Sequence, residues 1–263
     1  MKYITAIIKL LSFLIFSVII CLPQLVVLLF SKKKLFYKLP QIWHRAVCFI
    51  FNIKVHVHGD ISTDAQTLFV SNHISYLDIP AIGGLLDASF IAKSDVEGWP
   101  VFGFLSKLQR TIFIRRDRAA FQKARDKVQQ RLHMGHSLIL FAEGTSTDGH
   151  DILPLKSGLF SLVEPDKDTA ANTPPLRVQP MTVRIDTTNG VSLQNGGERD
   201  IYAWHGDMEL APHLWQLAKS RGAEISLFFH PPLDSAVIAK GRKEIAKTCH
   251  ATMKDALHPV RAE

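Results

Sequence analysis

The chain has 263 residues, enough for one sizeable α/β domain with an appendage and too few for two full domains to be expected. Its 31 lysines and arginines exceed its 24 aspartates and glutamates, and the net charge of +7 favours an anionic partner such as nucleic acid, a phosphorylated metabolite or a membrane face. Three widely spaced cysteines, Cys21, Cys48 and Cys249, indicate neither a disulfide framework nor a zinc site.

The first element in chain order predicts attachment to a membrane. Leu10–Phe30 is a run of 21 uncharged residues, about the length that crosses a hydrocarbon core of roughly 30 Å as a helix. Pro23 interrupts this run, so a kinked helix or a helical hairpin held in one leaflet is the alternative to a full span. A secretory signal peptide is disfavoured, because the run is longer than an h-region and no small-residue cleavage site follows it. The lysines that follow place the rest of the chain on the cytoplasmic face: Lys32, Lys33, Lys34 and Lys38.

The domain boundary is predicted near residue 53. Residues 1–53 are expected to form a membrane-anchoring helical segment, and residues 54–263 an α/β domain. A second apolar stretch, Ile42–Ile53, carries Trp43 and Phe49 among few charges. It fits either a continuation of the membrane-facing surface or a core helix of the main domain, and both alternatives stay open.

Beyond residue 54, short β-rich runs alternate with helical periodicity. One amphipathic helix is expected between a cap at Asp117 and a stop at Gly135, and a last surface helix is expected around Cys249. Residues 164–175 are predicted to be a disordered insert. The alternation predicts a single mixed or largely parallel sheet flanked by helices, with functional loops at the strand ends. The predicted strands are Thr67–Val70, Ser89–Ala92, Thr111–Ile114, Ser137–Phe141, Arg177–Ile185 and Ile225–Phe229.

A histidine and an aspartate five positions apart follow the first of these strands. His73 and Asp78 cannot share one face of a regular helix, because five steps of about 100° separate them by roughly 140°. A strand ending at Val70, a turn, and a helix beginning near Ser75 would let the Asp78 carboxylate fold back to the imidazole. A carboxylate holds the ring in one tautomer and makes it more basic, which suits removing a proton from an alcohol. Two polar residues in an ordinary turn remain the alternative.

Two later strand ends carry further polar residues. The strand Thr111–Ile114 runs into arginines at positions 115, 116 and 118, whose guanidinium groups suit a phosphate or carboxylate; a solvated basic turn is the alternative. The strand Ser137–Phe141 runs into Glu143, Gly144 and Thr145. The glycine lets backbone amides approach a ligand, and the glutamate can accept a hydrogen bond from a hydroxyl.

Taken together and in this order, these motifs resemble the glycerolipid acyltransferase family, the lysophosphatidic acid acyltransferases and their relatives. The similarity runs from residue 68 to about residue 185. The matching residues are Asn72, His73 and Asp78 for the N-H-x-x-x-x-D block, Phe113, Ile114 and Arg116 for the F-I-x-R block, and Glu143, Gly144 and Thr145 for the P-E-G-T block, in which Ala142 replaces proline.

The resemblance implies an acyl transfer from a thioester of coenzyme A or acyl carrier protein to the free hydroxyl of a lysophospholipid, foremost 1-acyl-glycerol-3-phosphate, at a membrane. His73 would be the general base and Asp78 would steady the imidazolium. No cofactor, metal or nucleic acid is expected. Covalent catalysis has no obvious nucleophile, because the chain lacks a G-x-S-x-G elbow. The implied substrate-binding residues are Arg116, for a phosphate, Glu143 with Gly144, for the glycerol part, and Thr145. Lys156 is a further candidate, with a solvated lysine as the alternative.

Three departures from the family pattern leave the acceptor head group open. Ser146 stands where arginine often follows E-G-T, Arg110 replaces a glycine and Arg115 an acidic residue. A lyso-ornithine lipid, which has no phosphate, is therefore an alternative acceptor. A non-catalytic lipid-binding protein and a hydrolase are alternatives from other classes, and a hydrolase would release thiol without any acceptor.

The segment Tyr202–Trp215 resembles a stretch of some bacterial members and has no mechanism assigned. His205, Asp207 and Glu209 would share one face if the segment were a strand. That arrangement would be a possible metal site, which we do not favour.

Overall fold

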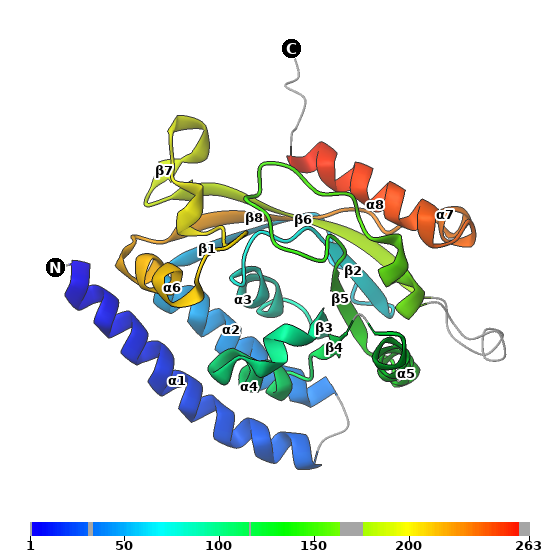
Figure 1. Cartoon of the computed structure of the whole chain (residues 1–263), viewed down its shortest axis with the longest axis horizontal. Coiled ribbons are helices and arrows are strands. Elements are labelled where there is room, and N and C mark those ends of the chain that lie inside the picture. The colour runs from blue at the N-terminus through cyan, green and yellow to red at the C-terminus, as the bar shows by residue number, and fades with distance from the viewer. Residues whose placement is uncertain (1, 31–33, 116, 164–175, 258–263) are drawn as a thin grey trace.

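The computed structural model describes residues 2–30, 34–115, 117–163 and 176–257, and its core is one mixed sheet (Figure 1). The order of the main path is β1-β8-β6-β2-β5-β3-β4, and β7 pairs with β6 at the side. Five neighbouring strands, from β6 to β4, are parallel, whereas β8 runs antiparallel to β6. The strands are β1 (Ile53–His58), β2 (Thr67–Ser71), β3 (Ala88–Lys93), β4 (Ile112–Ile114), β5 (Ser137–Phe141), β6 (Arg177–Thr188), β7 (Val191–Ser192) and β8 (Ala223–Phe229).

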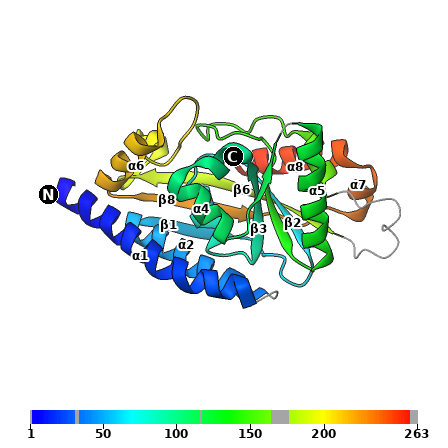
Figure 2. The ribbon, with the colours of Figure 1, turned by 60° about the horizontal axis from the view of Figure 1, so that its bottom comes forward.

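Helices cover both faces of the sheet, and alternating residues of the strands divide the core in two. Phe69 of β2 packs in one core with α1 (Lys2–Phe30), α2 (Lys38–Phe51), α3 (Asp78–Gly83) and α6 (Leu210–Lys219). Leu68 and Val70 point the other way, toward α5 (Arg118–His133) and α8 (Arg242–Leu257). Figure 2 shows α1 and α2 on one side of the sheet and α8 on the other. Two shorter helices are α4 (Pro100–Leu108) and α7 (Ser235–Ala239).

The pairing of β2 with β5 decides where the site forms. The strands are parallel, with Ser71 opposite Phe141 at their carboxyl ends. The loops that begin with Asn72 and Ala142 therefore leave the sheet side by side. This places two motifs about 70 residues apart in sequence at one edge, as expected for an α/β sheet.

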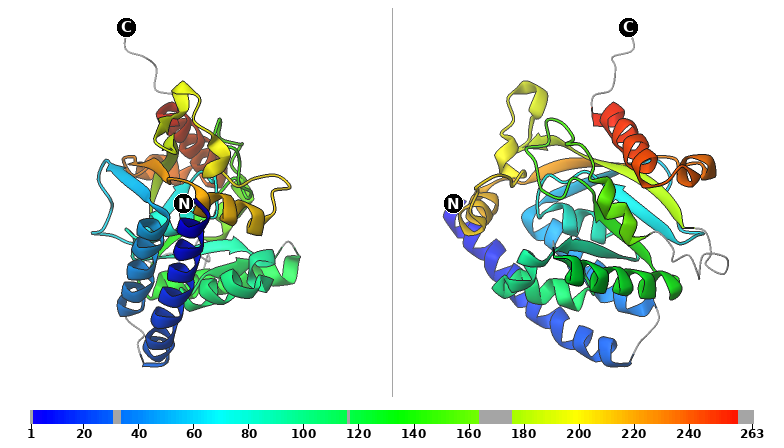
Figure 3. Two further views of the ribbon diagram at one scale, coloured as in Figure 1. Left: turned by 90° about the vertical axis from the view of Figure 1, so that its left-hand side faces the viewer. Right: turned by 45° about the vertical axis from the view of Figure 1, so that its right-hand side comes forward.

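The N-terminal apolar run forms one continuous helix and packs lengthwise on the domain. α1 continues through Pro23, so the predicted hairpin within this run does not form. α1 and α2 lie side by side (Figure 3). Polar contacts hold α1 along its length, among them Lys9 Nζ to Ser220 O at 3.0 Å, Trp43 Nε1 to Ser17 Oγ at 2.9 Å, and Gln24 Nε2 to Leu108 O at 2.9 Å.

α2 combines the two structures that its sequence allowed. Val47 and Phe51 are buried in the core, whereas Ile42 and Phe49 are exposed on the outer face.

The helix predicted between Asp117 and Gly135 is confirmed as α5, because the Asp117 carboxylate caps it by accepting from the Ala120 amide at 2.9 Å. The last helix is confirmed as α8.

Other elements differ from the expectation at their ends or were not predicted. The short strands β1 and β7 were not predicted, and the helix expected near Ser75 begins at Asp78. The β1 sequence, Ile53–His58, alternates histidine and valine at its centre, and the strand borders the sheet by pairing with β8. The insert predicted at 164–175 lies outside the described residues.

Candidate active site

His73 and Asp78 form a close pair just beyond the end of β2. The Asp78 Oδ2 atom lies 2.8 Å from His73 Nδ1, and the Asp78 side chain is fully buried. A carboxylate accepts at this position, so Nδ1 carries the proton and Nε2 remains a proton acceptor. The imidazole stacks on the Phe141 ring with 4.0 Å between centroids. The ring is thus held in one orientation and in the tautomer that a general base requires.

The Asp78 carboxylate is fixed by four donors. Besides His73, the Oδ2 atom accepts from the backbone amides of Ile74 at 2.7 Å and Ser75 at 3.0 Å. Oδ1 accepts from the Tyr202 hydroxyl at 2.9 Å. The turn from His73 to Leu77 makes this possible, because it folds the side chain of Asp78, the first residue of α3, back toward the amides of the turn. The four donors hold the buried carboxylate in one orientation.

Two further side chains hold the His73 loop to the neighbouring strands. The Asn72 amide group pairs with the backbone of Val183 in β6: Oδ1 accepts from the Val183 N–H at 2.7 Å and Nδ2 donates to the Val183 carbonyl at 2.9 Å. Glu143 Oε1 accepts from the His73 amide at 2.7 Å, and Oε2 accepts from the Leu153 amide at 2.7 Å. Burial raises the pKa of Glu143 to about 7. Both carboxylate oxygens of Glu143 thus accept hydrogen bonds from backbone amides. Contact of Glu143 with substrate stays a prediction.

Gly144, Thr145 and Lys156 meet beside this loop. Gly144 has φ +68°, and a Cβ there would lie 2.8 Å from Lys156 Nζ. The Lys156 side chain therefore covers Gly144. Thr145 is exposed and lines the cavity described next. The Gly144 amide donates to Phe141 O at 3.1 Å, so this particular N–H is already engaged within the turn.

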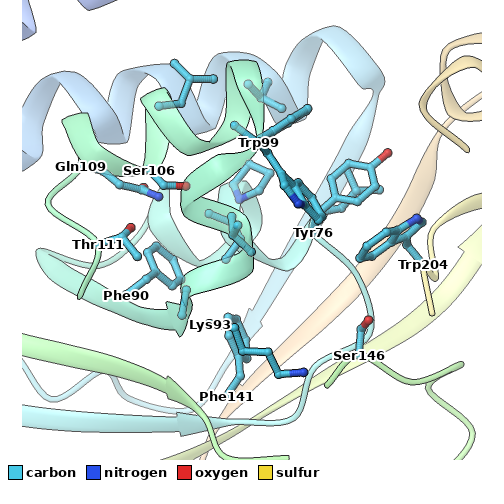
Figure 4. Close-up of a pocket in the computed structure, with 18 of the residues that line it drawn as sticks. Tyr76, Phe90, Lys93, Trp99, Ser106, Gln109, Thr111, Phe141, Ser146 and Trp204 are labelled. Atoms are coloured by element: carbon cyan, nitrogen blue, oxygen red, sulfur yellow. The ribbon is translucent and has the colours of Figure 1, made fainter. Parts of the chain in front are cut away.

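A largely apolar cavity of about 420 Å³ begins at His73 and extends under α4 toward α1 and α2. Its walls come from elements far apart in sequence, among them Phe13 of α1 and Trp43 of α2. Figure 4 shows the aromatic rings of Tyr76, Trp99 and Trp204 grouped at one end and the polar Ser106, Gln109 and Thr111 at another. The cavity is therefore suited to a long apolar chain whose reactive end lies near His73.

The predicted phosphate ligand Arg116 lies outside the described residues. Two other basic residues that depart from the family pattern are engaged locally. The Arg115 guanidinium pairs with Asp117 at 3.1 Å on the surface, and the Arg110 guanidinium lies 4.2 Å from the centre of the Phe36 ring. The structure thus brings together His73, Asp78, Glu143, Gly144, Thr145 and Lys156.

The site also contains aromatic residues that the sequence did not assign, foremost Tyr202, Trp204 and Tyr76. The segment Tyr202–Trp215 was singled out for its resemblance to a stretch of some bacterial family members, without a role. His205, Asp207 and Glu209 lie in a loop and turn rather than a strand. Within the described ranges, no three His, Cys, Asp or Glu side chains are grouped so that they could hold a metal ion.

A histidine held by a carboxylate at the start of an apolar cavity is an arrangement suited to taking a proton from a hydroxyl group. A family model described as Acyltransferase matches residues 52–183, half of the chain, and the chain belongs to this family of enzymes. The resemblance to the glycerolipid acyltransferase family, which rested on three motif blocks, is confirmed.

Relatives extend the likeness beyond the motif blocks. The chain is 33% identical over 214 residues to a lyso-ornithine lipid O-acyltransferase of Rhizobium meliloti, covering 80% of this chain and 71% of that protein. A protein of the same name from Brucella abortus is 34% identical over 225 residues, covering 84% and 82%. A 1-acyl-sn-glycerol-3-phosphate acyltransferase of Neisseria meningitidis is 35% identical over 170 residues, covering 64% and 61%.

The fold is shared with a solved structure over the whole chain. The crystal structure of the 1-acyl-sn-glycerophosphate acyltransferase PlsC from Thermotoga maritima matches with a TM-score of 0.68, covering 100% of this chain and 99% of that chain. Sequence identity to it is 18%, so this match establishes the fold, including the long N-terminal apolar helix, and nothing further.

Proposed function

We propose that this enzyme transfers an acyl group from a thioester donor to the free hydroxyl of a lysolipid, with lyso-ornithine lipid as the favoured acceptor. The observation that carries the proposal is the His73–Asp78 pair, 2.8 Å apart, at the start of an apolar cavity of about 420 Å³. The relatives favour lyso-ornithine lipid, which the sequence analysis gave as the alternative acceptor. Lyso-ornithine lipid acyltransferases align over 80% and 84% of this chain, and the glycerol-phosphate enzyme from Neisseria meningitidis over 64%.

The reaction follows from the geometry of the base. His73 Nε2 removes the hydroxyl proton as the oxygen attacks the thioester carbonyl, while Asp78 stabilises the imidazolium that forms. The tetrahedral intermediate collapses, the carbon–sulfur bond breaks, and the thiolate takes the proton from Nε2. An ester and a free thiol are formed, and the histidine returns to its starting tautomer. No acyl group is attached to the protein at any step.

The donor and acceptor assignments rest on chemistry. The apolar cavity suits the acyl chain, while coenzyme A and acyl carrier protein are both acidic and suit the chain's net charge of +7. An ornithine head group carries a carboxylate in place of a phosphate, and the exposed Lys156 ammonium beside Gly144 offers it a cation. Arg116 is retained as a proposed ligand for the same anionic group.

Membrane attachment is proposed through the outer face of α1. This helix is long and apolar enough to cross a membrane, and most of its outward side chains are exposed. However, α1 packs on α2, α4 and α6, so a full span would draw these elements into the hydrocarbon core. We infer that α1 lies in one leaflet, with the catalytic domain on the cytoplasmic face. The cavity, walled in part by α1, would then open where both substrates reside.

The direct test is thiol release from an acyl thioester by detergent-solubilised protein, with products identified by mass. Parallel reactions contain lyso-ornithine lipid, 1-acyl-glycerol-3-phosphate or no acceptor, and His73→Ala is the inactive control. Release that depends on lyso-ornithine lipid supports the proposal. Release that depends only on 1-acyl-glycerol-3-phosphate makes that lipid the acceptor instead. Equal release without acceptor indicates a hydrolase.

A further inference from the structure

We propose that Tyr202 is a positioning residue for the catalytic base, acting through Asp78; this inference rests on the proposed function of that pair. The Tyr202 hydroxyl donates to Asp78 Oδ1 at 2.9 Å, and both side chains are completely buried. Oδ2 has three donors of its own, whereas Oδ1 has Tyr202 as the one partner recorded among the described residues. Tyr202 therefore fixes the second oxygen of the carboxylate and adds to the resistance against rotation about the Cβ–Cγ bond.

The tyrosine is itself held in place by backbone on both sides. Its amide donates to the Arg199 carbonyl at 2.9 Å, and two residues later the Trp204 amide donates to the Ile74 carbonyl at 3.0 Å. The second bond joins the segment directly to the turn between His73 and Asp78. In the same segment, His213 Nδ1 lies 2.9 Å from the Tyr76 hydroxyl. Residues 202–213 thus form a second support for the catalytic turn, from a part of the chain beyond the matched family model.

A neutral donor on Oδ1 also changes the strength of the base. The hydroxyl draws negative charge from the carboxylate, so less charge remains on Oδ2 to stabilise the imidazolium. Loss of the hydroxyl should therefore move the acidic limb of the activity profile to higher pH. Among the described residues, Glu143 after β5 faces His73 and Asp78, and Cys48 on α2 faces Tyr202; the variants below leave both in place.

Tyr202→Phe is the main variant, and Tyr37→Phe is its matched control. Tyr37 is also a buried tyrosine with one hydroxyl contact, to Ser89 Oγ at 3.1 Å, and that contact lies outside the catalytic pair. We expect Tyr202→Phe to lower kcat roughly tenfold, the effect of losing one hydrogen bond to a buried charged group, with little change in KM. Tyr37→Phe should retain wild-type kcat even if its thermal stability falls to the same extent.

A second readout does not depend on the substrate. The rate at which diethyl pyrocarbonate modifies His73, followed by peptide mass spectrometry across pH 5 to 9, gives the pH midpoint of that modification. The midpoint should move upward in Tyr202→Phe and stay unchanged in Tyr37→Phe. Replacing Tyr202 with 3-fluorotyrosine, a stronger donor of nearly the same shape, should move it downward, and this variant serves if Tyr202→Phe does not fold.

The outcomes separate the two proposals. An unchanged His73 midpoint in folded Tyr202→Phe, or equal changes in both tyrosine variants, would overturn the role of Tyr202 whatever the substrate is. If the midpoint shifts as expected but no acceptor supports transfer, the positioning role stands and the proposed acyl acceptor is wrong. A shift accompanied by the expected fall in kcat supports both.

Discussion

The His73 imidazole lies almost flat against the Phe141 ring, with 4.0 Å between the centroids and 15° between the planes. Phe141 is the last residue of β5, and His73 follows β2 by two positions. The parallel pairing of Ser71 with Phe141 brings these two rings together. The sheet therefore positions one face of the base, while Asp78 positions its edge.

The first prediction concerns the base itself. His73→Ala should reduce acyl transfer by about 10³-fold, and Asp78→Asn by a similar factor, because the first removes the proton acceptor and the second disturbs its tautomer. Both should be measured by acceptor-dependent thiol release, with circular dichroism as a check on folding. His133→Ala, at an exposed position on α5, is the matched control and should retain full activity. Full activity of His73→Ala would remove the base assignment.

A second prediction follows from the raised pKa of Glu143. Burial moves this pKa from 4.5 to about 7, so the folded state binds a proton more tightly than the unfolded state. The associated stability is fully present below pH 4.5 and is lost as pH rises through 7, by roughly 3 kcal/mol. Glu143→Gln should lack this contribution to the slope of unfolding free energy against pH. Denaturant titrations of both proteins from pH 4.5 to 8 measure the difference, and identical slopes would contradict it.

The same substitution should also lower activity. A glutamine can accept at one end only, and its amide NH₂ would face either the His73 or the Leu153 amide, donor against donor. Where the NH₂ faces His73, the loop loses one of its side-chain supports. We expect a loss of about tenfold in kcat/KM, from a displaced base rather than from altered substrate contact.

Gly144 provides a third prediction, in which two effects can be separated. Gly144→Ala should destabilise the protein by about 1 kcal/mol or more, since an alanine is strained at φ +68°. Its Cβ would also lie 2.8 Å from Lys156 Nζ. In the double variant, Lys156→Ala should restore only the part of the lost stability that is due to this contact. Thermal unfolding of the two single variants and the double variant tests this, and complete restoration would mean that backbone strain is negligible.

A fourth prediction distinguishes the two faces of α1. Leu14→Glu combined with Val18→Glu places charges on the outer face, where both wild-type side chains are more than half exposed. These changes should weaken flotation with anionic vesicles and leave thermal stability nearly unchanged. Phe13→Ala, on the inner face, should instead destabilise the fold by about 3 kcal/mol, because it opens a cavity in the core. Unaltered flotation of the charged variant would place the membrane-binding surface elsewhere.

Sequence patterns predicted well those features that depend on neighbouring residues. Alternating apolar runs located six of the strands to within about three residues at each end, and the Asp117 cap and Gly135 stop located α5. The His73–Asp78 contact was also predictable, because it closes a short turn over five positions. β1 was missed although its sequence, Ile53–His58, does alternate, and β7 was missed because two residues carry no periodic pattern.

The sequence by itself determined the family, the local turn that joins His73 to Asp78, and a long apolar helix at the N-terminus. Only the tertiary structure decided that Glu143 holds the His73 amide, that α1 walls the cavity, and that Tyr202 reaches Asp78. Asp78 and Tyr202 are 124 positions apart, and their meeting depends on how β2, β6 and the following loop pack together. Motif spacing records short-range geometry, whereas such contacts arise from strand order and burial, which no local pattern encodes.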